Sequence, residues 1–177
     1  MKTKRLNPKP LGFSLMELMV SVVIMAILMT LAVPGFQTWL QNSQIRNAAE
    51  SIQNGLQRAR AEAVGRNRDV TFVLGAGSSW VIGVVGSGEV VESRSAGEGS
   101  RNVTVTVTPA GSATVTFNNL GSVRAANADA SVPFSQVDLD SPILAAADSQ
   151  ELRVTLGFGG NVRMCDPNAP AGSPRAC

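Results

Sequence analysis

The sequence predicts an α+β fold in which a long N-terminal helix packs on an antiparallel β-sheet. Two observations indicate the helix: residues 13–33 form an apolar run, and apolar residues then recur at helical spacing from Ile45 to Ala63. A third observation indicates the sheet, because apolar and polar residues alternate from Asp69 onward. A helix with one apolar face must bury that face, so we expect residues 45–63 to lie across the sheet.

The apolar run is long enough for one membrane crossing, which takes about 20 apolar residues. Its one charge is Glu17, and a carboxylate at the centre of a bilayer costs roughly 2.5 to 3.5 kcal/mol, so it needs a partner. Cleavage between Gly12 and Phe13 would create an amino group one helical turn before Glu17. The run is preceded by four basic residues, Lys2, Lys4, Arg5 and Lys9. Basic residues before the first apolar segment should keep that end of the chain in the cytoplasm.

The segment Gly12-Phe13-Ser14-Leu15-Met16-Glu17 resembles the processing site of type IV prepilins and type II secretion pseudopilins. Many pilins also have proline at the position of Pro34. The resemblance implies cleavage after Gly12 by a prepilin peptidase and N-methylation of Phe13. It also implies insertion in the inner membrane with the head in the periplasm, followed by assembly into a pilus or pseudopilus. In the filament, Glu17 would meet the Phe13 amine of a neighbouring subunit.

A plain signal anchor and a secretory signal peptide cut after Ala32 are the alternatives. Both fit poorly, because the apolar core of a signal peptide spans only about 7 to 15 residues and should not contain Glu. We therefore expect four segments: a leader (1–12), a transmembrane and filament-core helix (13–33), an amphipathic continuation of the helix (34–64) and a β-rich head with a C-terminal disulfide loop (65–177).

In the continuation, Pro34-Gly35 should bend the helix, because proline removes a backbone hydrogen bond and clashes with the preceding turn. Phe36 and Leu40 project away from the core-facing side and are predicted to contact other subunits or lipid headgroups. Gly65 is the expected C-cap. The predicted core face consists of Ile45, Ala48, Ala49, Ile52, Leu56, Ala59 and Ala63.

The expected strands are short and are separated by segments rich in Gly, Ser, Asn and Pro. They are Val70–Leu74, Trp80–Val85, Glu89–Glu92, Val103–Thr108, Thr114–Phe117, Phe134–Leu139, Glu151–Phe158 and Asn161–Cys165.

A second resemblance narrows the family. The segment Ala59-Arg60-Ala61-Glu62-Ala63, followed by Arg66-Asn67 and a strand, is similar to the FimT/GspH group of minor pilins and pseudopilins. The same holds for Phe117-Asn118-Asn119-Leu120-Gly121 and for Trp80 at a strand start.

Composition argues against an enzyme. The chain has no histidine, which removes Ser-His and Cys-His nucleophile pairs and His-based zinc sites. Asp138-Leu139-Asp140 offers two carboxylates without further placed oxygens, so we expect no metal site, no cofactor and no catalytic residue.

Net charge does not indicate a dedicated nucleic-acid binder. The leader holds four of the fifteen basic residues, which leaves eleven against thirteen acidic residues. The arginines at the helix end (Arg58, Arg60, Arg66 and Arg68) could grip phosphates, but a solvated helix end with an Arg58–Glu62 pair is the preferred interpretation.

Some FimT-like proteins bind DNA through a C-terminal Gly-Arg-x-Arg motif. The nearest match is Gly160-Asn161-Val162-Arg163, in which Asn161 replaces the first Arg. DNA contact through Arg163 and Arg175 is therefore not favoured.

Cys165 and Cys177 can form one intramolecular disulfide in an exported domain, and two free thiols are the alternative. The prolines between them build no helix or strand, so a disulfide should hold this tail beside the last strand.

Together these features predict a minor pilin of a type IV pilus, in its tip or priming complex, with other pilin subunits, the prepilin peptidase and the inner membrane as partners. The alternatives are a DNA-binding minor pilin for natural transformation and a GspH-type pseudopilin of type II secretion.

Overall fold

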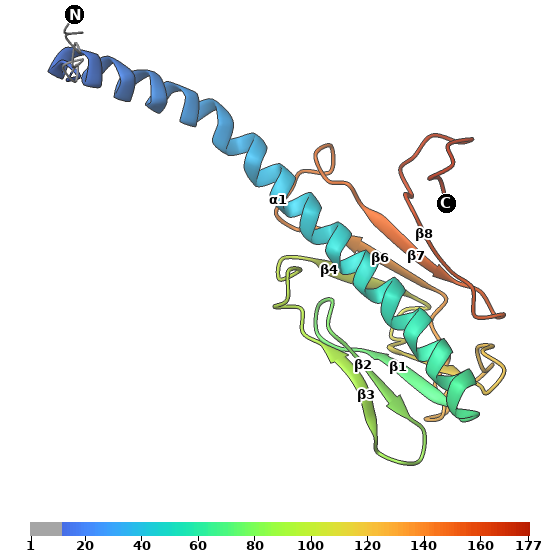
Figure 1. Cartoon of the computed structure of the whole chain (residues 1–177). Helices are drawn as coiled ribbons and strands as arrows, with labels where there is room; N and C mark the ends of the chain where they lie inside the picture. The colour runs from blue at the N-terminus through green and yellow to red at the C-terminus, as the bar shows by residue number, and fades with distance from the viewer. Residues whose placement is uncertain (1–11) are drawn as a thin grey trace, which may run out of the picture. The chain divides into compact units, whose positions relative to one another are not determined.

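One long helix and eight strands make up the computed structural model, which describes residues 12–177. The helix α1 spans Leu15–Arg66 (Figure 1). Pro34 lies within it. The chain separates into two compact units, with residues 12–37 in the first and 38–177 in the second. The predicted long N-terminal helix with an antiparallel β-rich head is thus confirmed, whereas the bend at Pro34 stays a prediction.

The strands form two four-stranded antiparallel sheets, whereas the sequence led us to expect a single sheet. The first sheet has the order β3-β2-β1-β5 and the second has the order β4-β6-β7-β8. Each expected strand is present, with ends that differ by at most two residues. The strands are β1 (Val70–Leu74), β2 (Trp80–Val84), β3 (Val90–Arg94), β4 (Thr104–Thr108), β5 (Thr114–Phe117), β6 (Gln136–Asp140), β7 (Leu152–Leu156) and β8 (Val162–Cys165).

The core lies between the sheets and the half of α1 that belongs to the second unit (Figure 1). Alternation explains which side of each strand is buried: in β1, Val70, Phe72 and Leu74 point inward while Thr71 and Val73 face outward. The helix contributes the predicted apolar face, and all seven of its members are fully buried: Ile45, Ala48, Ala49, Ile52, Leu56, Ala59 and Ala63.

Small residues allow α1 to approach the first sheet closely. A Cβ added at Gly55 would lie 2.7 Å from Cε2 of Phe72 and 3.1 Å from ring carbons of Trp80, so only glycine fits there without movement. One turn earlier, Ser51 accepts a buried hydrogen bond of 2.8 Å from the Trp80 indole nitrogen. This bond satisfies the indole N–H and fixes the position of the helix along the sheet.

The helix ends later than predicted, and Asn67 caps it instead of Gly65. Asn67 has a φ of 52°, its N–H donates to the Val64 carbonyl and the Arg68 N–H donates to the Ala63 carbonyl. These two bonds form a Schellman motif, which requires a left-handed residue just after the helix. Asparagine tolerates that conformation, so the prediction of Gly65 as the cap was wrong.

The C-terminal tail is closed by a disulfide between Cys165 and Cys177, with 5.0 Å between their Cα atoms. Cys165 ends β8 and is buried, whereas Cys177 is exposed. The Asp166 N–H donates to the Arg175 carbonyl at 2.7 Å, and Asp166 and Ala176 form a bridge. The tail therefore lies beside the end of the last strand, as the sequence predicted.

Candidate assembly site

Among the residues that the structure describes, the first half of α1 has an exposed, largely apolar surface. Every residue from 12 to 36 is exposed, and the most apolar stretch has a mean hydropathy of 2.4. By length and composition, this is a helix that could cross a membrane. Phe36 and Leu40, which the sequence placed away from the core, are 60% and 42% exposed. Lipid or other subunits could cover such a surface.

Ser14 caps the start of this helix. Its hydroxyl accepts a hydrogen bond of 3.1 Å from the Glu17 backbone N–H. The spacing Ser14-x-x-Glu17 is that of a capping box, and an acidic residue in the first turn also complements the helix dipole. Sequence analysis missed this capping role of Ser14, although the Ser-x-x-Glu signal was present.

Hydroxyl groups inside the apolar helix are satisfied locally. Ser21 donates to the Glu17 carbonyl and Thr30 donates to the Ile27 carbonyl, both at 2.7 Å. Within residues 12–177, by contrast, no ion pair or side-chain hydrogen bond engages the Glu17 carboxylate. This carboxylate therefore needs a partner outside residues 12–177.

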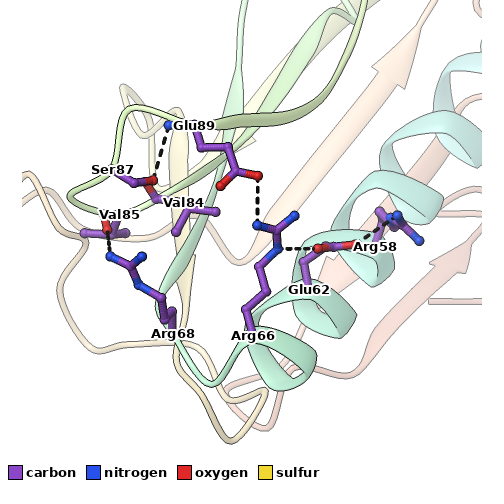
Figure 2. Close-up of polar contacts among 8 residues, drawn as sticks. All are labelled: Arg58, Glu62, Arg66, Arg68, Val84, Val85, Ser87 and Glu89. Atoms are coloured by element: carbon purple, nitrogen blue, oxygen red, sulfur yellow. Dashed lines mark hydrogen bonds and ion pairs between the residues drawn. The ribbon is translucent and has the colours of Figure 1, made fainter.

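Ion pairs link the end of α1 to the first sheet (Figure 2). Arg66 lies between two carboxylates, with 2.6 Å to Glu62 and 2.8 Å to Glu89, which precedes β3. The predicted Arg58–Glu62 pair is present at 2.9 Å. The hydrogen bond from Arg66, aided by the charges of Arg58 and Arg66, lowers the pKa of the Glu62 carboxyl below its usual value. The hydrogen bonds to Glu62 and Glu89 raise the pKa of Arg66.

The remaining arginines of this cluster bind backbone carbonyls. Arg68 donates to the Val85 carbonyl at 3.4 Å (Figure 2), and Arg60 donates through Nε to the Gly121 carbonyl at 3.0 Å. Gly121 and Gly160 both have positive φ angles and lie so close to Arg60 that an added Cβ would touch its side chain. These contacts favour a structural role for Arg60 and Arg68 at the helix end over phosphate binding.

The two arginines considered for DNA contact lie at the second sheet and its tail. Arg163 is in β8, and its guanidinium donates to the Ala176 carbonyl at 2.8 Å. Arg175 is exposed in the tail between the cysteines. Because Arg163 is engaged by the tail, the geometry adds no support to DNA binding, which stays an untested alternative.

The paired aspartates of β6 have protein partners. Asp138 accepts a hydrogen bond of 2.5 Å from Arg153 of β7, and Asp140 accepts one from the Ser149 hydroxyl. Within the part of the chain that the structure describes, no group of three or more potential metal-binding side chains comes together.

Comparisons with known proteins agree with the fold. A family model described as "Type II transport protein GspH" matches residues 48–160, and one described as "Prokaryotic N-terminal methylation motif" matches residues 8–33. The type IV minor pilin FimU of Pseudomonas aeruginosa is 20% identical, with a TM-score of 0.51 over 75% of this chain and 94% of that chain. The minor pseudopilin EPSH of Vibrio cholerae is 12% identical, with a TM-score of 0.50 over 73% and 98%. No curated protein matches the chain closely enough to count as a relative.

Proposed function

The chain belongs to the GspH family, and from this premise we propose that it is a minor pilin in the tip or priming complex of a type IV pilus. At the coarser level it is a minor pilin or pseudopilin with a prepilin methylation motif. One observation carries the proposal: the motif is joined to a helix whose apolar side chains are all exposed from residue 12 to 36. Such a helix suits packing against like helices in a filament.

Processing is the first step of the proposed function. A prepilin peptidase removes residues 1–12 after Gly12, and the new amino group of Phe13 is methylated. Residues 13–33 then anchor the chain, 34–64 continue the helix and 65–177 form the head. Because Ser14 caps the helix directly after Phe13, cleavage at this point would leave the helix start intact.

Assembly is the second step. Before it, the chain lies in the inner membrane with its head in the periplasm. Pairing of Glu17 with the Phe13 amine of a neighbouring pilin subunit then neutralises the carboxylate, which has no partner among the described residues of its own chain. Pro34 marks the exit from the apolar segment.

A pseudopilin of type II secretion is the second candidate. The description of the matching family model favours it, because that description refers to type II transport. EPSH, one of the similar structures, is a type II secretion pseudopilin. The anchor, the processing step and the assembly chemistry would be the same in both candidates.

A deletion strain separates these functions. Loss of surface pili and twitching, restored by a plasmid copy, is the expected result. Loss of exoprotein secretion with intact pili would replace the proposal by the pseudopilin function. Loss of transformation alone would establish the DNA-binding alternative. A complementing copy with Arg163→Ala tests whether any transformation defect depends on the one arginine of the Gly-Asn-Val-Arg segment.

A further inference from the structure

The two sheets have four outer strands, and their edges differ in how they are protected from pairing with another chain. The outer strands are β3 and β5 in the first sheet and β4 and β8 in the second. An outer strand presents a row of unpaired N–H and C=O groups that can pair with another chain, so natural proteins cover or disrupt such edges. Three of these four edges carry a recognisable protection.

The segment 123–128 covers the edge at β5. The Arg124 N–H donates to the Thr116 carbonyl at 2.9 Å, and the Asn127 side-chain amide donates to the Thr114 carbonyl at 2.9 Å. Two acceptors of β5 are therefore occupied by the chain itself.

The disulfide-closed tail protects the edge at β8. Arg163 within this strand donates to the Ala176 carbonyl, and Asp166 just after it pairs with the tail. A charged side chain and a covalently held segment thus both obstruct the approach of another strand.

Charge and irregular pairing protect the edge at β3. This strand carries Glu92 and Arg94, and its register against β2 shifts so that Val91 has no counterpart. Charged residues and bulges are both common ways to prevent edge-to-edge pairing.

No such device protects β4. Its sequence is Thr-Val-Thr-Val-Thr, and no charged residue occurs between Arg101 and Arg124. The strand pairs with β6 in an unbroken register, and within residues 12–177 no backbone hydrogen bond and no other strand reaches its outer edge. Val105 and Val107 pack on the core yet remain only half-buried. A further strand would cover them and satisfy the free backbone groups.

We propose that the outer edge of β4 receives an extended strand from the head of a different pilin-type subunit, an inference that rests on the proposed function. The ladder of backbone groups selects an extended chain, and the uncharged Thr and Val side chains select a segment that is itself uncharged and β-branched. The strand extends the second sheet as a fifth member beside β4.

A second copy of this chain does not suit the edge. Two β4 strands that pair antiparallel are related by a twofold axis normal to the sheet. The half of α1 in the head, residues 38–66, lies on one face of the sheets, so that axis would reverse its direction in the second copy, whereas subunits of one filament run the same way. Parallel pairing of two β4 strands instead requires a twofold axis along the strands, which would place the two helix halves on opposite faces of the joined sheet. A filament whose subunits pack their helices together admits neither arrangement.

Photo-crosslinking in the full chain, expressed in its own cells, tests the proposal. Benzoylphenylalanine replaces Thr106 at the centre of β4 and, as the control, Val90 on the protected β3 edge, which is 62% exposed. We expect at least tenfold more adducts at position 106 than at position 90. The partner peptides in these adducts should come from another protein with a prepilin-type N-terminus. Adducts only between copies of this chain, or equal yields at both positions, would overturn the proposal.

Charge substitutions give an independent measurement. Thr106→Lys places an ammonium opposite Asp138 of β6, so the isolated head should tolerate it. We expect the melting temperature of this variant to equal that of the wild type. Sheared filament fractions should contain at least tenfold less of Thr106→Lys than of the wild type, and they should contain wild-type amounts of the control Val90→Lys. Wild-type amounts of Thr106→Lys would overturn the β4 interface alone. Absence of the wild-type chain from filaments of either kind would overturn the proposed function as well.

Discussion

At the scale of single residues, the helix–sheet contact depends on Gly55. Glycine inside a helix ordinarily costs about 1 kcal/mol relative to alanine, so its presence here requires a compensating gain. The rings of Phe72 and Trp80 occupy the space that a methyl group would take. Close approach of the helix is the gain, and neither helical periodicity nor composition revealed it.

Gly55→Ala should therefore destabilise the head. Overpacking costs about 1–3 kcal/mol and exceeds the propensity gain of about 1 kcal/mol, which leaves a net loss of up to about 2 kcal/mol. The matched control is Gly65→Ala, in the same helix with nothing within 4 Å of the added Cβ, which should stabilise by about 0.5–1 kcal/mol. Thermal melting of the two variants checks the opposite signs, and equal shifts would contradict this account of Gly55.

Glu62 gives the head an acid-sensitive contact. Its pKa in the folded state is lowered from 4.5, mainly by the hydrogen bond from Arg66. A lowered folded-state pKa means that the unfolded state binds the proton more readily, so the stabilisation is complete above 4.5 and is lost as pH falls through the folded-state value. Glu62→Gln should flatten the fall of melting temperature in this acid range. Identical pH profiles for wild type and variant would show that Glu62 contributes nothing.

At the scale of elements, periodicity predicted the helix and every strand. The buried face of a helix or strand repeats apolar residues at that element's own spacing, so the sequence of the element alone reveals it. Periodicity did not predict the division into two sheets. β1 pairs with β5, although β2, β3 and β4 lie between them in the sequence, and β4 pairs with β6. No alternation pattern encodes these pairings. The helix cap was also misplaced, since Asn67 and Gly65 are both acceptable cap residues and only the backbone geometry distinguishes them.

The disulfide loop is an element whose removal should be mild. In the chain-entropy model a loop of this size contributes about 3 kcal/mol, and fraying of the tail in the folded variant reduces the loss. Replacing Cys165 and Cys177 together by serine should lower the melting temperature by a few degrees. Processing after Gly12 should not change. Global unfolding of the double variant at growth temperature would show that the tail belongs to the core.

At the scale of the whole molecule, the candidate site was predicted in part. The sequence predicts that Glu17 needs a partner and that the motif around Gly12 is a processing site, and both stay predictions. It could not identify the partner or the open β4 edge, because filament contacts involve other chains and edge exposure depends on the complete sheet order. The capping role of Ser14 was local and could have been predicted.

Processing and assembly can be separated with two variants of the full chain. Gly12→Val should leave an unprocessed chain in the membrane, because a larger side chain obstructs the peptidase. Glu17→Ala should be cleaved normally yet be at least tenfold depleted from sheared filaments, since it leaves a neighbouring amine unpaired.

Glu50→Ala is the control for Glu17→Ala, because it removes an exposed carboxylate from the same helix. It should assemble normally. Wild-type incorporation of Glu17→Ala would remove Glu17 from the assembly mechanism, and a mature Phe13 terminus in Gly12→Val would contradict the cleavage site.

The contacts of α1 with the head also have a mechanical consequence. They are distributed from one end of the helix half 38–66 to the other, and the bonded pairs are Asn42–Asp148, Gln44–Asn102, Ser51–Trp80, Arg60–Gly121 and Arg66–Glu89. Tension applied at Thr38 along the helix axis therefore loads these contacts in shear, so that they share the force instead of opening one after another. Under pulling, the rate of forced unfolding depends on the barrier to breaking them together. The head should thus withstand a sudden pull better than its equilibrium stability alone would indicate.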